Sequence, residues 1–169
     1  MLFYSLMEII SLDANLNSNL LFEMHHSHLD FALGVVQISH GMAEHKFRYK
    51  HFIDYLNSEG FHVAIYDHRG HGDRIADNKI GFFSSKNGWS NVVNDLVAVH
   101  NKTNNLYPDL PKVLLGHSMG SWISLSAAQK ETKFDMLLLS GSSYPKSFET
   151  ALQKIFLRIE TLRLGNHGY

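Results

Sequence analysis

Cysteine is absent from this 169-residue chain, and proline occurs only three times. Without cysteine the chain can form neither disulfides nor thiolate metal sites. It also lacks an excess of charge, since 15 lysines and arginines stand against 16 aspartates and glutamates, and no basic stripe appears. A nucleic acid is therefore not an expected partner.

The apolar start of the chain, residues 1–10, lacks the features of a targeting signal. It has no basic region and no small-residue cleavage site, and it is too short for a membrane span. We therefore expect a cytoplasmic location. Hydrophobic residues make up 44% of the chain and aromatic residues 12%, which is enough for one domain with a hydrophobic core.

Strand-like and helix-like segments alternate along most of the chain. Short apolar or β-branched runs predict strands at residues 7–12, 20–28, 34–39, 61–66, 113–115 and 134–140. Helical spacing of apolar residues indicates helices at 47–59, from 89 to about 104, after residue 120, and from 147 onward. This alternation predicts the α/β class, with a mainly parallel sheet and helices on both of its faces.

The chain is organised around a G-x-S-x-G pattern, in which Gly116 and Gly120 flank Ser118. A buried strand precedes the pattern and small residues at helical spacing follow it, which is the context of a nucleophile elbow. Only glycine at both flanking positions lets strand and helix pass so closely around a strained serine. The hydroxyl of Ser118 should then stand clear of the sheet, beside the N–H of Met119. An ordinary glycine and serine turn is the alternative.

A second turn of interest follows the predicted strand 34–39. His40 and Gly41 begin a turn in which Gly41 permits a sharp bend, so that the N–H of Met42 can project toward a reacting carbonyl group. A plain connection between strand and helix is the alternative. Met42 and Ser118 both follow strands, and ligands of parallel sheets bind at the carboxyl ends of the strands.

Several of the twelve histidines lie in patterns that resemble catalytic or metal sites. One such pattern is a loop punctuated by glycines that contains Asp67, His68 and His71. In proteins with a nucleophile elbow, however, the catalytic acid and base come after the serine in the chain, and these residues come before Ser118. We expect this loop to be structural, with Asp67 and Arg69 holding neighbouring backbone.

A short H-x-H-x-D pattern lies at residues 26–30 and resembles the start of a zinc site. The position where such sites have a further histidine is Phe31, and short motifs often match by chance. We expect no metal here, and we expect His26 and His28 to share the solvent side of an outer strand.

Four segments together resemble one family. They are residues 39–49, 66–72, 81–96 and 107–121, in the order and at about the spacing of the α/β-hydrolase fold. Within that fold they resemble the group of monoacylglycerol lipases, lysophospholipase-like hydrolases and serine aminopeptidase-type domains. The resemblance implies Ser118 as nucleophile, the N–H groups of Met42 and Met119 as oxyanion donors, and His40, Gly41, Gly116, His117 and Gly120 as supporting turn residues. It implies no metal or cofactor.

The resemblance also implies the domain layout. The second strand should be antiparallel, which gives an antiparallel pair at the N-terminus. Residues 1–146 should be the N-terminal part of the hydrolase core, and residues 147–169 the start of a lid. Asp73 and Arg74 replace a small hydroxyl residue of the family, a change expected to affect only the rim of the pocket.

The family's acid and base lie after the lid, in the order Ser, Asp or Glu, His, whereas this sequence stops at Tyr169. We therefore expect a truncated α/β-hydrolase fold without those two triad members. His40 and His45 are the only stand-ins for the base, because the side chain of His117 should project away from the hydroxyl of Ser118.

Three functions remain open. The first is a serine hydrolase of carboxylic esters, acting on monoacylglycerol or lysophospholipid through an acyl-enzyme at Ser118. The second is a truncated, non-catalytic remnant or binding module of the same fold, and the third is a histidine-rich metal protein. A lipid or small ester is the expected ligand, peripheral membrane contact stays open, and the apolar segment 136–139 should promote self-association as an edge strand.

Overall fold

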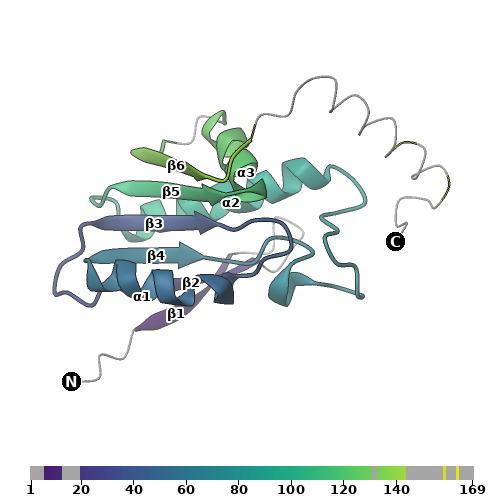
Figure 1. The fold of residues 1–169 in the computed structure, drawn as a ribbon. Coiled ribbons are helices and arrows are strands. Elements are labelled where there is room, and N and C mark those ends of the chain that lie inside the picture. Colours follow the sequence, from purple (N-terminus) through teal and green to yellow (C-terminus); the bar gives the residue numbers. More distant parts are fainter. Residues whose placement is uncertain (1–5, 13–19, 131–132, 144–157, 159–162, 164–169) are drawn as a thin grey trace.

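Six strands form one mixed sheet in the order β1-β2-β4-β3-β5-β6 (Figure 1). The structure is a computed structural model, which describes residues 6–12, 20–130, 133–143, 158 and 163. The strands are β1 (Met7–Leu12), β2 (Leu20–His25), β3 (Gly34–Ser39), β4 (Phe61–Ile65), β5 (Lys112–His117) and β6 (Met136–Ser140). The helices are η2 (Lys46–Tyr49), α1 (Lys50–Ser58), η3 (Gly72–Arg74), α2 (Gly88–Leu106) and α3 (Met119–Ala128), where η2 and η3 are short 3₁₀ turns.

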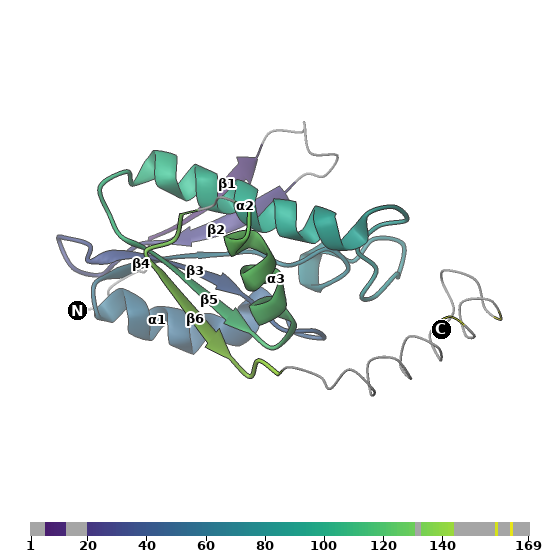
Figure 2. The same cartoon turned by 90° about the horizontal axis from the view of Figure 1, so that it is seen from above.

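The sheet is mainly parallel, as predicted. Strand β3 pairs in parallel with β4 and β5, and β5 pairs in parallel with β6. Strand β2 is antiparallel to both β1 and β4, which gives the expected antiparallel pair at the N-terminus. Figure 2 shows α1 on one face of the sheet and α2 with α3 on the other, so helices cover both faces.

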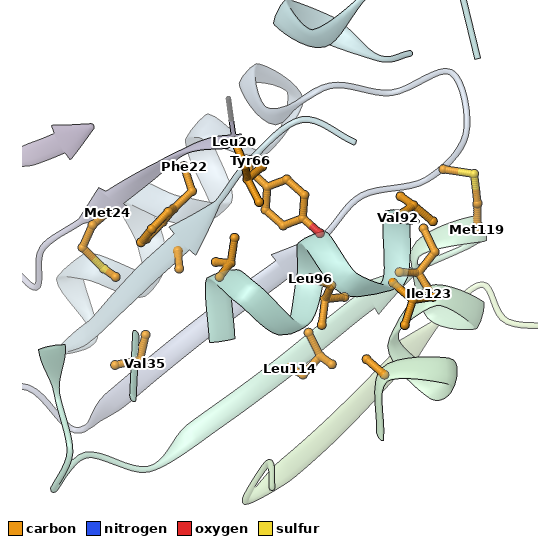
Figure 3. Close-up of a cluster of buried hydrophobic side chains, with 14 residues drawn as sticks. Leu20, Phe22, Met24, Val35, Tyr66, Val92, Leu96, Leu114, Met119 and Ile123 are labelled. Atoms are coloured by element: carbon orange, nitrogen blue, oxygen red, sulfur yellow. The ribbon is translucent and has the colours of Figure 1, made fainter. Parts of the chain in front are cut away.

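Each face of the sheet carries its own hydrophobic core. Between the sheet and α2 with α3, Val35 of β3 and Leu114 of β5 pack with Leu96 and Ile123 of the helices (Figure 3). On the opposite face, Ile53 of α1 packs against alternate residues of β3 and β4. Strand β3 is buried along its whole length, as is usual for a central strand of a parallel sheet covered on both sides. The parallel pairing of β3 with β5, in which Ser39 lies opposite Gly116, places their carboxyl ends side by side.

The predicted helix at 47–59 is present in two parts. It begins as the 3₁₀ turn η2 and continues as α1, which ends before Gly60. Gly60 has a φ of +91°, a conformation that favours glycine at a helix end. Within α1, the buried Asn57 donates hydrogen bonds from Nδ2 to the carbonyl oxygens of His25 and Phe61, so that α1 is tied to β2 and β4.

Two sequence predictions about strands are wrong. Strand β2 ends at His25, and it lies between β1 and β4 and not at the edge. His26 and His28 therefore lie beyond the strand. The ring of His26 contacts those of His62 and Tyr107, with centroid distances of 5.3 and 6.5 Å. His26 is therefore held by contacts with these rings and does not lie on the solvent side of a strand.

Strand β6 is an edge strand among the described strands, as expected, and most of it is exposed although its apolar run is typical of a buried strand. It begins at Met136 and has a pairing partner, β5, on one side only among the described strands. Met136 is 53% exposed, and Leu138 is 43% exposed. The predicted lid from Ser147 lies outside the described residues. No helix in the described part of the chain is long and apolar enough to cross a membrane.

Candidate active site

Ser118 occupies the sharp turn between β5 and α3. Its backbone has a φ of 51° and a ψ of −118°, a strained conformation for a residue with a side chain, of the kind that clusters at functional sites. The side chain is exposed at the carboxyl end of β5. The structure therefore has the predicted order of elements, in which a strand is followed by a sharp turn and a helix.

The two glycines of the motif are required by space. A Cβ added to Gly120 would lie 2.0 Å from the carbonyl oxygen of Ser39 on β3. A Cβ added to Gly116 would lie 2.6 Å from the carbonyl oxygen of Gly120. Because both obstacles are backbone atoms, no side-chain movement could relieve the contact. The glycines therefore let α3 approach β3 and β5 closely enough to bring Ser118 beside the loop after β3.

Backbone hydrogen bonds hold the turn in place. The N–H of Ser118 donates to the carbonyl oxygen of Ser140 on β6 at 2.8 Å, and the carbonyl oxygen of Ser118 accepts from the N–H and the hydroxyl of Ser121. Met119 is the first residue of α3, and N–H groups in the first turn of a helix have no intrahelical acceptor. The N–H of Met119 therefore has no acceptor within α3.

The loop after β3 reaches the same place. A Cβ added to Gly41 would lie 3.3 Å from the Cβ of Ser118, so the two turns are in direct contact. His40 is fully buried and lies with Nδ1 2.8 Å from the carbonyl oxygen of Gly41 and Nε2 3.0 Å from the backbone nitrogen of His68. Since the N–H of His68 can only donate, Nε2 accepts and Nδ1 carries the proton.

This arrangement sets the direction of one peptide group. The peptide between Gly41 and Met42 is trans, so its C=O and N–H point in opposite directions. The C=O is directed at the buried ring of His40, and the N–H of Met42 therefore points away from the interior. The side chain of Met42 is 71% exposed. Met42 thus lies in an exposed turn that contacts Ser118 through Gly41, with its N–H directed outward.

Neither His40 nor His45, the two histidines considered as stand-ins for the base, has a hydrogen bond to the hydroxyl of Ser118 among the described residues. Both ring nitrogens of His40 have partners, and burial lowers the pKa of His40, so it is a neutral structural residue. His45 precedes η2, and its ring centroid lies 6.0 Å from that of Phe47. His117 lies between Ser140 Oγ, 3.3 Å from Nδ1, and Glu44 Oε1, 3.8 Å from Nε2. Among the described histidines none hydrogen-bonds the hydroxyl of Ser118.

Glu44 is a site residue that the sequence analysis did not single out. Its Oε2 accepts hydrogen bonds from the N–H of Gly41 and the hydroxyl of Tyr49, both at 2.8 Å. Its Oε1 pairs with Arg48 at 3.0 Å. Burial alone would raise the pKa of the Glu44 carboxyl, but the hydrogen bonds from Gly41 and Tyr49, together with the charges of His117 and Arg48, lower the pKa. The only sequence signal was the four-residue spacing from Glu44 to Arg48.

The loop at residues 67–72 is structural, as predicted. Asp67 accepts backbone N–H groups from Lys46 at 2.7 Å and Asp73 at 2.9 Å, so it holds neighbouring backbone. Arg69 instead pairs with the carboxylate of Asp95 on α2. His68 is fully buried, and its ring centroid lies 4.3 Å from that of His40. Through His68, this loop therefore packs against His40 and helps to hold the turn after β3 in place.

The H-x-H-x-D pattern is not assembled into a metal site. Within residues 6–12, 20–130 and 133–143, no group of three or more His, Asp or Glu side chains could hold a metal ion. The Nε2 atom of His26 lies 3.6 Å from Glu8 on β1. Its Nδ1 atom lies 3.3 Å from the hydroxyl of Tyr107.

A sequence model described as serine aminopeptidase, S33, matches residues 32–165. The chain belongs to this family. Among its relatives, it is 35% identical over 109 residues to a monoacylglycerol lipase of Mycolicibacterium smegmatis, covering 64% of the chain and 37% of that protein. It is 30% identical over 139 residues to the monoglyceride lipase of Homo sapiens, covering 78% of the chain and 44% of that protein.

Solved structures agree on the fold of this S33 family chain. A thermostable carboxyl esterase from Bacillus coagulans in complex with glycerol superposes with a TM-score of 0.78 at 28% identity, covering 94% of this chain and 52% of that one. The α/β-hydrolase fold expected from the resemblance is therefore confirmed. The chain spans less than half the length of the two lipases and about half that of the esterase.

Proposed function

We propose that this S33 family chain contributes the nucleophile and the oxyanion donors of a serine hydrolase that acts on carboxylic esters of lipids. The observation that carries the proposal is the contact between the turn of Ser118 and the turn of Gly41. It brings an exposed hydroxyl beside an outward-pointing N–H group. The relatives named as monoglyceride lipases support a lipid ester as the substrate class, with monoacylglycerol or lysophospholipid as the specific candidates.

In this reaction the Oγ of Ser118 attacks the carbonyl carbon of the ester. The carbonyl oxygen becomes negatively charged and is stabilised by the N–H groups of Met42 and Met119, an arrangement of donors that contributes strongly to acyl transfer. Collapse of the intermediate releases the alcohol and leaves an acyl ester on Ser118. Water then attacks this ester, releases the carboxylic acid and restores the hydroxyl.

The proton of Ser118 must pass to a base and then to the leaving alcohol, because a free hydroxyl is a weak nucleophile near neutrality. From the chain's resemblance to the family, the base is expected to be a histidine that follows the lid in the sequence and is oriented by an acid. His40 is unsuited to it, since both of its ring nitrogens are hydrogen-bonded. A serine hydrolase without its base retains about 10³–10⁴-fold acceleration over water from the oxyanion hole and binding.

Peripheral contact with a lipid surface belongs to the same proposal. Met42, which is 71% exposed, lies in the loop that contacts Ser118, and Trp122, on the first turns of α3, is 41% exposed. Exposed apolar side chains beside a reactive serine would favour delivery of a lipid from a membrane surface.

Labelling with a fluorophosphonate probe tests the assignment of Ser118. We expect the wild-type chain to be labelled slowly, because no described histidine acts as a base for Ser118. Ser118→Ala should be unlabelled, and Ser58→Ala, a change at an exposed serine of α1, should be labelled as the wild type is. Circular dichroism of each variant establishes that it is folded. A folded wild type that resists labelling would contradict the hydrolase assignment and favour a non-catalytic binding module of the same fold.

A further inference from the structure

The carboxylate of Glu44 connects three segments of the candidate site. It accepts the N–H of Gly41 in the loop after β3, and it binds Tyr49 and Arg48 of η2. Its second oxygen lies 3.8 Å from Nε2 of His117, the residue before Ser118. The side chain of Glu44 is only 11% exposed. A single partly buried carboxylate thus joins the oxyanion loop to the turn of the serine.

Two side chains together fix both peptide groups of Gly41. Glu44 Oε2 receives the N–H of the peptide before Gly41 at 2.8 Å. His40 Nδ1 donates to the C=O of the peptide after Gly41 at 2.8 Å. With both of its flanking peptide planes held, Gly41 has little freedom left, although glycine alone would allow many conformations. The second of these planes carries the N–H of Met42.

We propose that Glu44 is a positioning residue, whose carboxylate holds the Gly41 turn so that the N–H of Met42 faces the carbonyl oxygen of the substrate at Ser118. This inference rests on the proposed function and adds to it a residue outside the predicted site. Glu44 touches no reacting atom, and it acts through the backbone of Gly41.

The charge of Glu44 is part of this role. A carboxylate offers only acceptors, and hydrogen bonds to an ionised acceptor are stronger than those between neutral groups. Tyr49 and Gly41 both donate to the same oxygen, and Arg48 donates to the other. A glutamine of the same shape would present an NH₂ group to one of these sets of donors. Glu44→Gln therefore disturbs the turn with almost no change in volume.

The test uses fluorophosphonate labelling of the whole chain at several probe concentrations, which separates the maximal rate of labelling from the concentration giving half of it. Loss of one oxyanion donor costs about 10²–10³-fold in rate, and a displaced donor should cost part of that. We expect Glu44→Gln to lower the maximal rate about tenfold or more and to leave the half-saturating concentration unchanged. Glu59→Gln, at the exposed position directly after α1, is the matched control and should label as the wild type does.

A second measurement follows the backbone amide resonances of Gly41 and Met42 by NMR, and it requires no activity. In the wild type, the Gly41 amide proton should shift as the pH is lowered through the titration of Glu44. In Glu44→Gln this shift should be absent, and the Met42 resonance should be displaced.

The outcomes separate the two proposals. A wild-type maximal rate in Glu44→Gln overturns the positioning role. If the wild type is not labelled at all, the hydrolase assignment fails, and NMR decides on Glu44. Displaced resonances of Gly41 and Met42 in Glu44→Gln would then support its role in holding the turn, whereas unchanged resonances would overturn it.

Discussion

Arg69 and Asp95 form a two-point ion pair, in which Nε and Nη2 of the guanidinium each lie 2.8 Å from a different carboxylate oxygen. Asp95 is on α2 and only 1% exposed, and Arg74 adds a third contact at 2.8 Å. The pair fastens the loop that follows β4 to the helix over the larger core. Because His68 of that loop donates a hydrogen bond to His40, the ion pair helps to hold the candidate site in place without touching it.

Replacing Asp95 by asparagine should therefore destabilise the fold. The change keeps the shape but removes the carboxylate charge that Arg69 and Arg74 share, and removal of one partner of a buried ion pair costs about 3–5 kcal/mol. Both arginine side chains are 14% exposed, so they keep some solvent contact and we expect a loss of about 3 kcal/mol. Urea denaturation measures the free energy of unfolding.

Asp77→Asn is the control for this prediction, because the side chain of Asp77 is 83% exposed. Substitutions at such surface positions usually change stability by no more than about 0.5 kcal/mol. Equal unfolding free energies for Asp95→Asn and Asp77→Asn would show that the ion pair contributes little.

Gly120→Ala should prevent folding or cost more than about 3 kcal/mol, at the upper end of the effects of overpacking. The new Cβ would lie 2.0 Å from the carbonyl oxygen of Ser39, and β3 cannot retreat because it is buried on both faces. Gly88→Ala is the matched control, since its Cβ would meet only a side-chain carbon of Phe83 at 3.2 Å. Yield of soluble protein and thermal unfolding compare the two. A Gly120→Ala variant as stable as Gly88→Ala would contradict the packing argument.

Features with a local cause could be predicted from the sequence. The turn at Ser118 depends on two glycines within two residues of it, and the strand before it is marked by an unbroken apolar run. The same holds for the end of α1 at Gly60. In each case the residues that determine the structure are neighbours in the chain, so their spacing alone carries the information.

Features that depend on distant partners could not be predicted. Asp95 is separated by 26 positions from Arg69, and in the sequence it is one acid on the polar side of a helix. Glu44 meets His117 only because β3 and β5 are adjacent. The exposure of β6 depends on how many neighbours the strand has, which its apolar run alone does not show. These relations follow from the order of the strands in the sheet.

The buried His100 should make stability depend on pH. Its side chain packs on Phe134, with ring centroids 4.0 Å apart, and Nε2 accepts a hydrogen bond from Asn104. Burial lowers the pKa of His100 from 6.5 to about 4. As the pH falls below 6.5, the unfolded chain therefore binds a proton that the folded chain does not, and stability decreases by about 1.4 kcal/mol per pH unit until about pH 4.

His100→Gln should remove this contribution. We expect the unfolding free energy of the variant to decrease less steeply than that of the wild type between pH 6.5 and 4, by about 1.4 kcal/mol per pH unit. His51→Gln, at an exposed position of α1, should retain the wild-type slope. Urea denaturation at a series of pH values gives both slopes. Parallel profiles for His100→Gln and the wild type would show that His100 is not the group responsible.

Strand β6 should cause the chain to self-associate. It pairs with β5 on one side, and on the other side the described residues place no strand against it. An edge strand presents unpaired N–H and C=O groups, and natural proteins protect such edges with charged residues, whereas this one carries Met136, Leu138 and Leu139. Sedimentation velocity over a range of concentrations should therefore show oligomers. Leu138→Lys should shift the distribution toward monomer, while Leu106→Lys on α2, where the leucine is equally exposed at 43%, should not. A wild type that stays monomeric at every concentration would refute association through this edge.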